Sequence, residues 1–375
     1  MNIEKPKSAD LANVYFSTTY REAREKFLAV CNNENARITN YFHPEEKCAD
    51  GGVLATDVAR FGPDNAKKIA LFICGTHGLE AAPGAATFIQ WITQGGPQSL
   101  SADMAVLFVH AINPFGWAHF RRCDEGNVDV NRNCFERNTV VPHNEAYREL
   151  HNCMVSDELS DASLENSIRA FRRFCDEYGL AKGFQGWTAG QYEFPNGISY
   201  GGEEESWSYK TLKTILAEHF QYAEKSISID WHTGIGEYGD PFIILNGSKG
   251  SEKYIRACRY WSEEYVHTDD FYDGQIAVEH TGLVMTAVEE LKNLHSNAEM
   301  ISAVVEWGTY PIDEMFKSLL IDRRLQCLDP NGNLHDEAAL RRRLRESFNP
   351  TDPIWRRSIL AHADRIYRQS IEGLA

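Results

Sequence analysis

The chain has 375 residues, of which 43% are hydrophobic, and its formal net charge is −16. This length allows a full hydrophobic core in one large α/β domain or in two smaller ones. The acidic balance argues against a nucleic-acid backbone or an anionic membrane as a partner, because both require a basic face on the protein.

The sequence also predicts a cytoplasmic location. The N-terminal residues lack the apolar stretch that follows the charges of a secretory signal. No run of residues approaches the roughly 18 consecutive apolar side chains of a membrane span. The nine cysteines form no C-x-x-C pair, so we expect reduced thiols in a cytoplasmic protein.

Five short apolar runs along the chain predict buried strands, at residues 69–74, 104–110, 226–231, 242–245 and 301–307. The runs are continuous rather than alternating, which is typical of a sheet covered on both faces. Helical periodicity lies between them; Leu212, Ile215 and Leu216, for example, share one helical face. This alternation predicts an α/β fold with a mixed, mostly parallel central sheet and helices on both faces.

Two further segments have helical patterns. The polar stretch around residues 135–186 predicts a helical insertion, and residues 311–375 predict a helical C-terminal tail. In the tail, Asp352 and Pro353 suit the N-cap and the first position of a last helix. We therefore expect residues 1–375 to form a single domain.

Four residues point to a metal centre. His77 and Glu80 stand three positions apart just after the first apolar run, and His232 and Glu306 stand at the ends of two later runs. Sites in open α/β sheets form outside the carboxyl ends of the strands, where residues distant in sequence can meet. Two histidines and one glutamate make a catalytic zinc triad that leaves one position open for water. A fourth carboxylate nearby could take the proton of that water.

A second motif, Asn127-Val128-Asp129-Val130-Asn131-Arg132-Asn133, follows about fifty residues after His77. The order H-x-x-E, D-x-N-R-N, strand-end His and strand-end Glu resembles the zinc carboxypeptidase superfamily, which includes the aspartoacylase and succinylglutamate desuccinylase deacylases. Asn113-Pro114-Phe115-Gly116 and Glu306-Trp307-Gly308-Thr309 extend the resemblance, which spans roughly residues 69–310 and is closest to a bacterial carboxypeptidase-like branch.

This resemblance assigns His77, Glu80 and His232 as the zinc ligands. It assigns Glu306 as the catalytic carboxylate that activates water and then protonates the leaving amine. Asp129 would orient the first histidine. Asp230 could orient His232 in the same way, or alternation along its strand could aim it at the other face.

The resemblance also implies residues that bind the substrate. Asn131 and Arg132 would grip a substrate carboxylate, a task that suits a planar guanidinium. A structural ion pair with Asp129 or another acid is the alternative for Arg132. Arg122 would polarise the scissile carbonyl, although Arg121 is adjacent. For a tyrosine beside the scissile bond the candidates are Tyr192, Tyr200, Tyr238 and Tyr272.

The predicted function is zinc-dependent hydrolysis of an amide or peptide bond next to a free carboxylate, as in a metallocarboxypeptidase. An N-acyl amino acid deacylase of the aspartoacylase type is the first alternative, and a non-catalytic zinc-binding protein is the second. The helical tail departs from the C-terminal β-domain of the deacylases. We expect a small peptide or N-acyl amino acid as substrate; side-chain preference, a second metal and the oligomeric state stay open.

Overall fold

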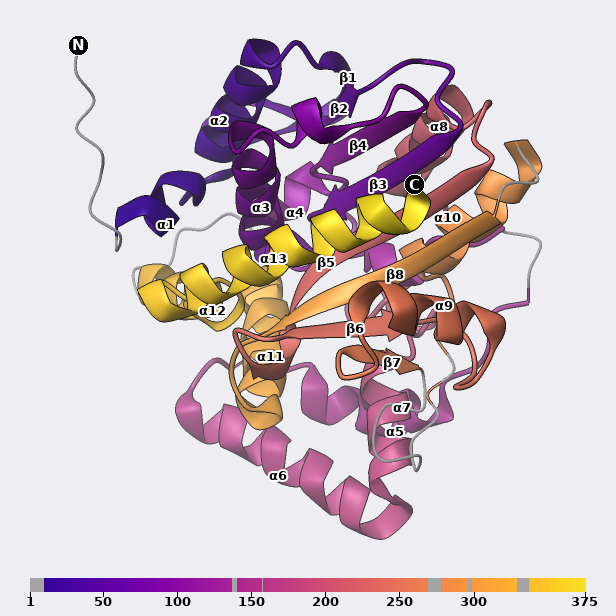
Figure 1. Cartoon of the computed structure of the whole chain (residues 1–375). Helices are drawn as coiled ribbons and strands as arrows, with labels where there is room; N and C mark the ends of the chain where they lie inside the picture. The colour runs from indigo at the N-terminus through magenta and orange to yellow at the C-terminus, as the bar shows by residue number, and fades with distance from the viewer. Residues whose placement is uncertain are drawn as a thin grey trace.

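The computed structural model describes residues 10–136, 140–156, 158–268, 278, 280–295, 299–328 and 337–375. Within these residues, one eight-stranded sheet runs through the molecule in the order β1-β2-β4-β3-β5-β8-β6-β7 (Figure 1). The strands are β1 Arg37–Lys47, β2 Val53–Phe61, β3 Lys68–Cys74, β4 Met104–His110, β5 Lys225–Tyr238, β6 Pro241–Leu245, β7 Val266–Thr268 and β8 Glu299–Gly308.

The sheet is mixed and mostly parallel, which confirms the predicted fold. The central strands are β4, β3, β5 and β8, and each neighbouring pair among them is parallel. β7 is also parallel to β6. Antiparallel pairing joins β1 to β2, β2 to β4 and β6 to β8. All five predicted strands are present. Three strands were not predicted. β1 is a largely exposed edge strand, β2 carries polar Thr56, Asp57 and Arg60, and β7 has only three residues.

Helices cover both faces of the sheet. Alternate residues of β3 enter two different cores, with Phe72 in one and Leu71 in the other, so the strand is apolar throughout. The first face is covered by α1 Asp10–Tyr15, α2 Tyr20–Asn33, α3 Ala81–Thr93, α4 Pro114–Ala118, α9 Glu252–Trp261 and α13 Pro353–Leu374. The second face is covered by α8 Trp207–His219 and α10 Val284–His295.

A third hydrophobic cluster joins two segments that lie far apart in the sequence. It unites α5 Glu145–Met154, α6 Asp161–Tyr178, α7 Leu180–Thr188, α11 Ile312–Leu328 and α12 Glu337–Phe348. Phe171 of α6 packs on Phe316 of α11 with ring centroids 4.6 Å apart. Figure 1 shows α6 and α7 below the sheet, with α11 above them. Leu79, between His77 and Glu80, belongs to the same cluster. The helices therefore pack directly onto the predicted metal-binding turn.

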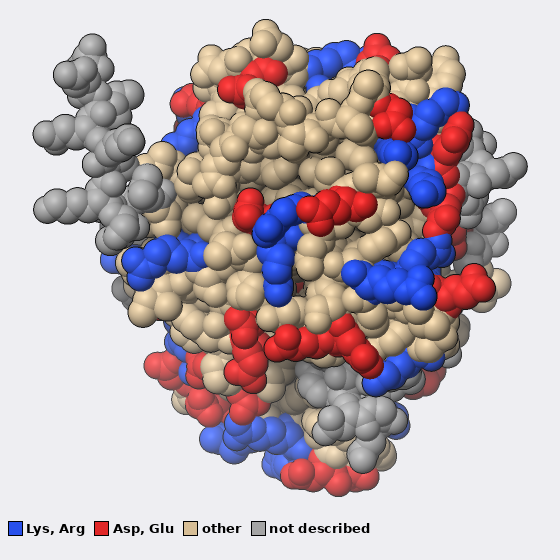
Figure 2. Space-filling view, viewed as in Figure 1, with Lys and Arg blue, Asp and Glu red and all other residues tan. Residues whose placement is uncertain are grey.

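The C-terminal helix α13 begins as predicted. The Asp352 side chain accepts a hydrogen bond from the Ile354 N–H at 2.9 Å, and Pro353 occupies the first turn. None of the described helices combines the length and apolar character needed to cross a bilayer. On the face seen in Figure 2, acidic and basic side chains are interspersed.

Candidate metal centre

The turn after β3 holds His77 and Glu80 in fixed positions. His77 precedes the short 3-10 helix η1 Gly78–Glu80, which leads directly into α3. A Cβ atom on Gly78 would lie 2.0 Å from the carbonyl carbon of Gly116 in α4, so only glycine fits there. The Gly78 N–H also donates to the Arg122 carbonyl at 3.1 Å. The turn is thus fixed from both sides, and its two functional side chains face the carboxyl end of the sheet.

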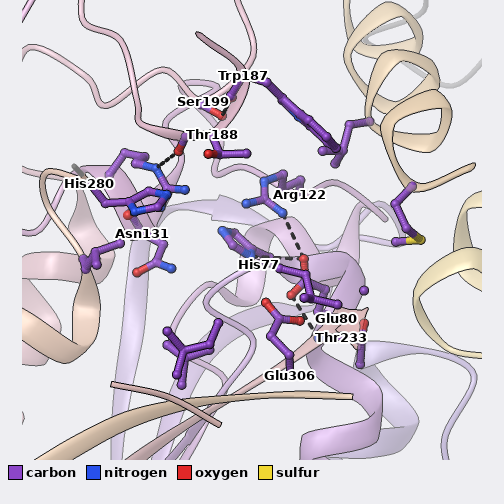
Figure 3. Close-up of a pocket in the computed structure, with 18 of the residues that line it drawn as sticks. His77, Glu80, Arg122, Asn131, Trp187, Thr188, Ser199, Thr233, His280 and Glu306 are labelled. Atoms are coloured by element: carbon purple, nitrogen blue, oxygen red, sulfur yellow. Dashed lines mark hydrogen bonds and ion pairs between the residues drawn. The ribbon is translucent and has the colours of Figure 1, made fainter. Parts of the chain in front are cut away.

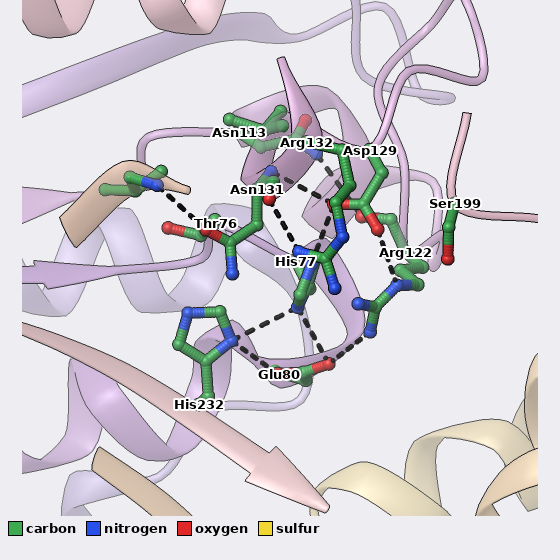
Figure 4. Close-up of polar contacts among 12 residues, drawn as sticks. Thr76, His77, Glu80, Asn113, Arg122, Asp129, Asn131, Arg132, Ser199 and His232 are labelled. Atoms are coloured by element: carbon green, nitrogen blue, oxygen red, sulfur yellow. Dashed lines mark hydrogen bonds and ion pairs between the residues drawn. The ribbon is translucent and has the colours of Figure 1, made fainter. Parts of the chain in front are cut away.

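His77, Glu80 and His232 converge on one point. Nδ1 of His77 lies 3.1 Å from Oε1 of Glu80, and Nδ1 of His232 lies 2.9 Å from Oε2. The two Nδ1 atoms are 3.1 Å apart (Figure 4). All three side chains are buried, and each offers a ligand atom within 4.8 Å of the others. These residues could therefore hold one metal ion.

A carboxylate sets the tautomer of each histidine. Nε2 of His77 donates to Asp129 Oδ1 at 3.0 Å, and Nε2 of His232 donates to Asp230 Oδ2 at 2.8 Å. Thr76 donates its hydroxyl to Asp230 in turn, at 2.8 Å. Asp230 therefore faces His232 and not the other side of the sheet, because residues two apart on a strand point to the same face.

The donor set fits a divalent cation such as zinc. With protons on both Nε2 atoms, the Nδ1 lone pairs of His77 and His232 face each other and the Glu80 carboxylate. These electron-rich atoms repel one another unless a positive charge lies between them. Two imidazole nitrogens and one carboxylate are the ligands that catalytic zinc takes, with a position left for water. Carboxylates behind both histidines complete the pattern.

Glu306 lies beside this cluster without belonging to it. It is 8% exposed, and among the described residues its Oε2 has no hydrogen-bond partner. Burial raises the pKa of the Glu306 carboxyl to about 8, and the negative Glu80 acts in the same direction, whereas His232 and Arg122 oppose it. The Glu306 carboxyl group therefore faces the cavity with a pKa raised towards neutral pH.

Arg122 bridges two acids of the centre. Its Nη1 donates to Glu80 Oε1 at 3.0 Å, and its Nε lies 3.3 Å from Asp129 Oδ2. Its backbone N–H donates to Asp322 of α11 at 3.2 Å. Arg122 lines the cavity next to Glu80, so its guanidinium can reach a substrate oxygen held there.

Asn131 lies on the opposite side of His77 from Arg122 (Figure 3), and Arg132 follows it in the short helix η3 Val130–Arg132. The Asn131 Oδ1 accepts from the Val284 N–H at 2.9 Å, and among the described residues the amide NH₂ of Asn131 stays available to a ligand. Arg132 donates to two carbonyls, from Nε to Thr188 at 2.7 Å and from Nη1 to Asn131 at 2.6 Å. No ion pair with a described acid involves Arg132, so the structure does not support the alternative of a structural pair with Asp129.

A cavity of about 190 Å³ opens between these groups (Figure 3). Its described polar lining includes His77, Glu80, Arg122, Asn131 and Glu306. None of the described tyrosines lines it. The Tyr192 hydroxyl donates to the Arg132 carbonyl, Tyr200 is in the core, and Tyr238 is 43% exposed. The fourth candidate, Tyr272, lies outside the described residues.

A family model matches residues 16–362, and its description is "Protein of unknown function (DUF2817)". The chain belongs to this family. No curated protein shows significant sequence similarity to this chain.

Solved structures similar to this chain include metallocarboxypeptidases and a succinylglutamate desuccinylase. Carboxypeptidase A from Helicoverpa armigera is 12% identical, with a TM-score of 0.49 over 92% of this chain and 74% of that one. Bovine thrombin-activatable fibrinolysis inhibitor is 11% identical, with a TM-score of 0.46 over 84% and 99%. The succinylglutamate desuccinylase from Chromobacterium violaceum is 15% identical, with a TM-score of 0.38 over 83% and 75%. At these values the likeness does not extend to activity or substrate.

Several cavity residues carried no sequence signal. Burial lowers the pKa of the His280 imidazole to about 3, and the positive charge of nearby Arg132 acts in the same direction. Trp187, Met315 and Val304 also line the cavity. As single apolar residues inside predicted helices and strands they look like ordinary core positions, and only the three-dimensional arrangement shows that they face the site.

Proposed function

We propose that this member of the family is a zinc-dependent hydrolase that cleaves an amide bond next to a free carboxylate, as a metallocarboxypeptidase does. The observation that carries the proposal is the convergence of His77, Glu80 and His232 beside Glu306, whose Oε2 has no hydrogen-bond partner among the described residues. The substrate in this proposal is a small peptide or an N-acyl amino acid in the cytoplasm.

Glu306 is the proposed proton carrier. A bound zinc ion would polarise the scissile carbonyl and lower the pKa of water towards about 7. The Glu306 carboxylate accepts the proton of the attacking water and then donates it to the leaving amine. Its raised pKa supports this exchange, because a carboxyl group that binds a proton near neutral pH can both take it and return it.

The two arginines have separate tasks. Arg122 stabilises the negative charge that develops on the carbonyl oxygen, from a position already fixed by Glu80 and Asp129. Arg132 and the Asn131 amide bind the substrate carboxylate. The absence of a described acid partner for Arg132 supports this, since a buried guanidinium gains most from a carboxylate that matches its planar fork.

The same machinery would also hydrolyse an N-acyl amino acid, because that substrate likewise presents a carboxylate next to its amide. A panel of dipeptides and N-acyl amino acids, assayed on zinc-loaded protein, tests the proposal. We expect hydrolysis of at least one class, lost in the Glu306→Gln protein. Zinc binding without hydrolysis of any member would instead favour the non-catalytic zinc protein.

A further inference from the structure

Apart from Ile235 and Val278, the apolar side chains that line the described part of the cavity fall into two groups. The first, called here the strand-side wall, consists of Ile244 and Val304 on the sheet with Leu283 and Met285 at the start of α10. The helical wall consists of Phe184, Trp187, Ile312, Met315, Leu319 and Phe348, from α7, α11 and the end of α12.

The strand-side wall adjoins the proposed carboxylate-binding pair. Val304 stands two residues before Glu306 on β8 and pairs with Ile244 of β6, so both flank the base. Leu283 directly precedes Val284, whose N–H holds the Asn131 amide oxygen. With the substrate carboxylate at Asn131 and Arg132, the amino-acid side chain of the substrate meets this wall.

The members of the helical wall on α11 and α12 reach the centre from the other side. A Cβ atom on Gly234 would lie 3.1 Å from the Met315 methyl group, so Met315 covers the end of β5 just after His232. Thr233 donates its hydroxyl to the Phe348 carbonyl at 2.7 Å, which fixes the end of α12 at the same place. In Figure 3, Asn131 lies on one side of His77 and Thr233 on the other.

The chemistry of the substrate decides which group meets which wall. In an N-acyl amino acid or a dipeptide, the carboxylate and the acyl group lie on opposite sides of the scissile amide. A carboxylate held by Arg132, with the amide at the metal centre, sends the acyl group towards the β5 side. The acyl group therefore meets the members of the helical wall on α11 and α12.

The helical wall presents no charged side chain. Among the described lining residues, the titratable groups are His77, Glu80, Arg122, Arg132, His280 and Glu306, all outside this wall. Trp187 of this wall packs on Phe316 of α11 with ring centroids 4.7 Å apart. A charged acyl group there would lose its hydration, and it could reach the Arg122 guanidinium only in competition with Glu80 and Asp129, whereas an apolar one gains contact area.

We propose that the substrate is an amide whose acyl part is bulky and apolar, held by the helical wall, and not a dicarboxylic acyl group such as succinyl. This inference rests on the proposed function. It gives α11 and the end of α12, both in the C-terminal tail, a role in substrate selection.

Two isosteric ligands test the proposal, N-(4-methylpentanoyl)-phenylalanine and N-succinyl-phenylalanine, because the two methyl groups of the first replace the carboxylate oxygens of the second. Calorimetry with zinc-loaded Glu306→Gln protein measures binding without turnover. We expect at least about tenfold tighter binding of the 4-methylpentanoyl compound. Affinity should also rise about threefold to fourfold per methylene in an acetyl, butanoyl, hexanoyl series.

Substitutions in the Glu306→Gln background locate the effect. Leu319→Lys introduces a cation into the helical wall and should reduce the preference about tenfold. Ile312→Lys, at a position 38% exposed, provides a second variant that preserves folding. Leu340→Lys is the matched control, because Leu340 is part-buried in the same hydrophobic cluster but does not line the cavity. The control should leave the preference unchanged.

Equal or tighter binding of the succinyl compound would overturn the proposal, as would failure of both ligands to bind or a preference unaltered by both wall variants. Wild-type hydrolysis separates this inference from the proposed function. Hydrolysis of both compounds without discrimination removes the apolar subsite and leaves the hydrolase. Discriminating binding without hydrolysis by the wild type leaves the subsite and removes the hydrolase.

Discussion

His232 and Glu306 occupy paired positions on the neighbouring parallel strands β5 and β8. Residues in register on adjacent strands point to the same face, so the histidine and the carboxylate stand side by side at the carboxyl end of the sheet. His232 completes the cluster with His77 and Glu80, while Glu306 stays one strand further away. This one-strand offset places a carboxylate next to the cluster of His77, Glu80 and His232 without making it a member of that cluster.

The first prediction concerns metal binding. Purified protein should contain about one zinc ion per chain, and His77→Ala should remove it, because two ligands bind a divalent ion far more weakly than three. Elemental analysis after dialysis measures the stoichiometry. His280→Ala, which removes a cavity histidine outside the cluster, is the control and should keep its zinc. Undiminished zinc in His77→Ala would exclude this assignment.

The second prediction separates the proposed base from the ligands. Glu306→Gln preserves the shape of the side chain but cannot accept a proton. It should keep zinc and thermal stability while turnover falls by about 10²–10⁴-fold. Zinc content, melting temperature and kcat are measured on the same preparation. Near-normal turnover would place the base elsewhere, and loss of zinc would make Glu306 a ligand.

The third prediction concerns the substrate carboxylate. Converting that carboxylate to an amide should lower kcat/KM about a hundredfold, since a bidentate charge-assisted pair is lost. Arg132→Ala should lower kcat/KM similarly on the free acid and little on the blocked substrate, as a double-mutant-style cycle measures. Arg148→Ala, at an exposed ion pair, is the control. If wild-type protein cleaves both substrates equally well, the enzyme is an endopeptidase or a general amidase.

The fourth prediction concerns the carboxylate behind His232. Asp230→Asn keeps the size of the side chain but weakens its hold on the imidazole Nε2–H, so zinc affinity should fall about 10–100-fold. Competition with a chromophoric chelator measures the affinity. Asp103→Asn, which changes a surface ion pair, is a suitable control. An unchanged zinc affinity would show that Asp230 serves only the fold.

The fifth prediction concerns pH and stability. His110 is fully buried and stacks on Phe27, and burial lowers its pKa to about 3. An unfolded histidine titrates near 6.5, so between these values the unfolded state binds more protons than the folded state. His110 should therefore reduce the free energy of unfolding by about 1.4 kcal/mol for each pH unit below 6.5.

His110→Phe should remove this dependence, so the loss of stability between pH 7 and pH 5 should be smaller by about 2 kcal/mol than in the wild type. Denaturant unfolding at the two pH values measures the difference. His143→Phe, at an exposed position, should keep the wild-type dependence. An identical pH dependence in His110→Phe and wild type would show that His110 does not titrate on unfolding.

Local patterns in the sequence were enough to predict the central strands and the candidate ligands. A continuous apolar run such as residues 69–74 indicates a strand buried on both faces, because each face needs every second side chain. The spacing of His77 and Glu80 suits a single turn, and His232 and Glu306 follow strands of the same kind. Edge strands gave weaker patterns, and β1 was missed because solvent accepts polar side chains along it.

The sequence by itself thus determined which histidine and carboxylate side chains stand at the strand ends, because residue type and short spacing are properties of the chain. Only the tertiary structure decided which groups are partners. It placed Asp322 of α11 on the backbone of Arg122, and Met315 over Gly234. It also gave Arg132 no ion pair with any of the described acidic residues. Such contacts join segments up to two hundred residues apart, and their geometry depends on how whole helices pack, which local spacing does not encode.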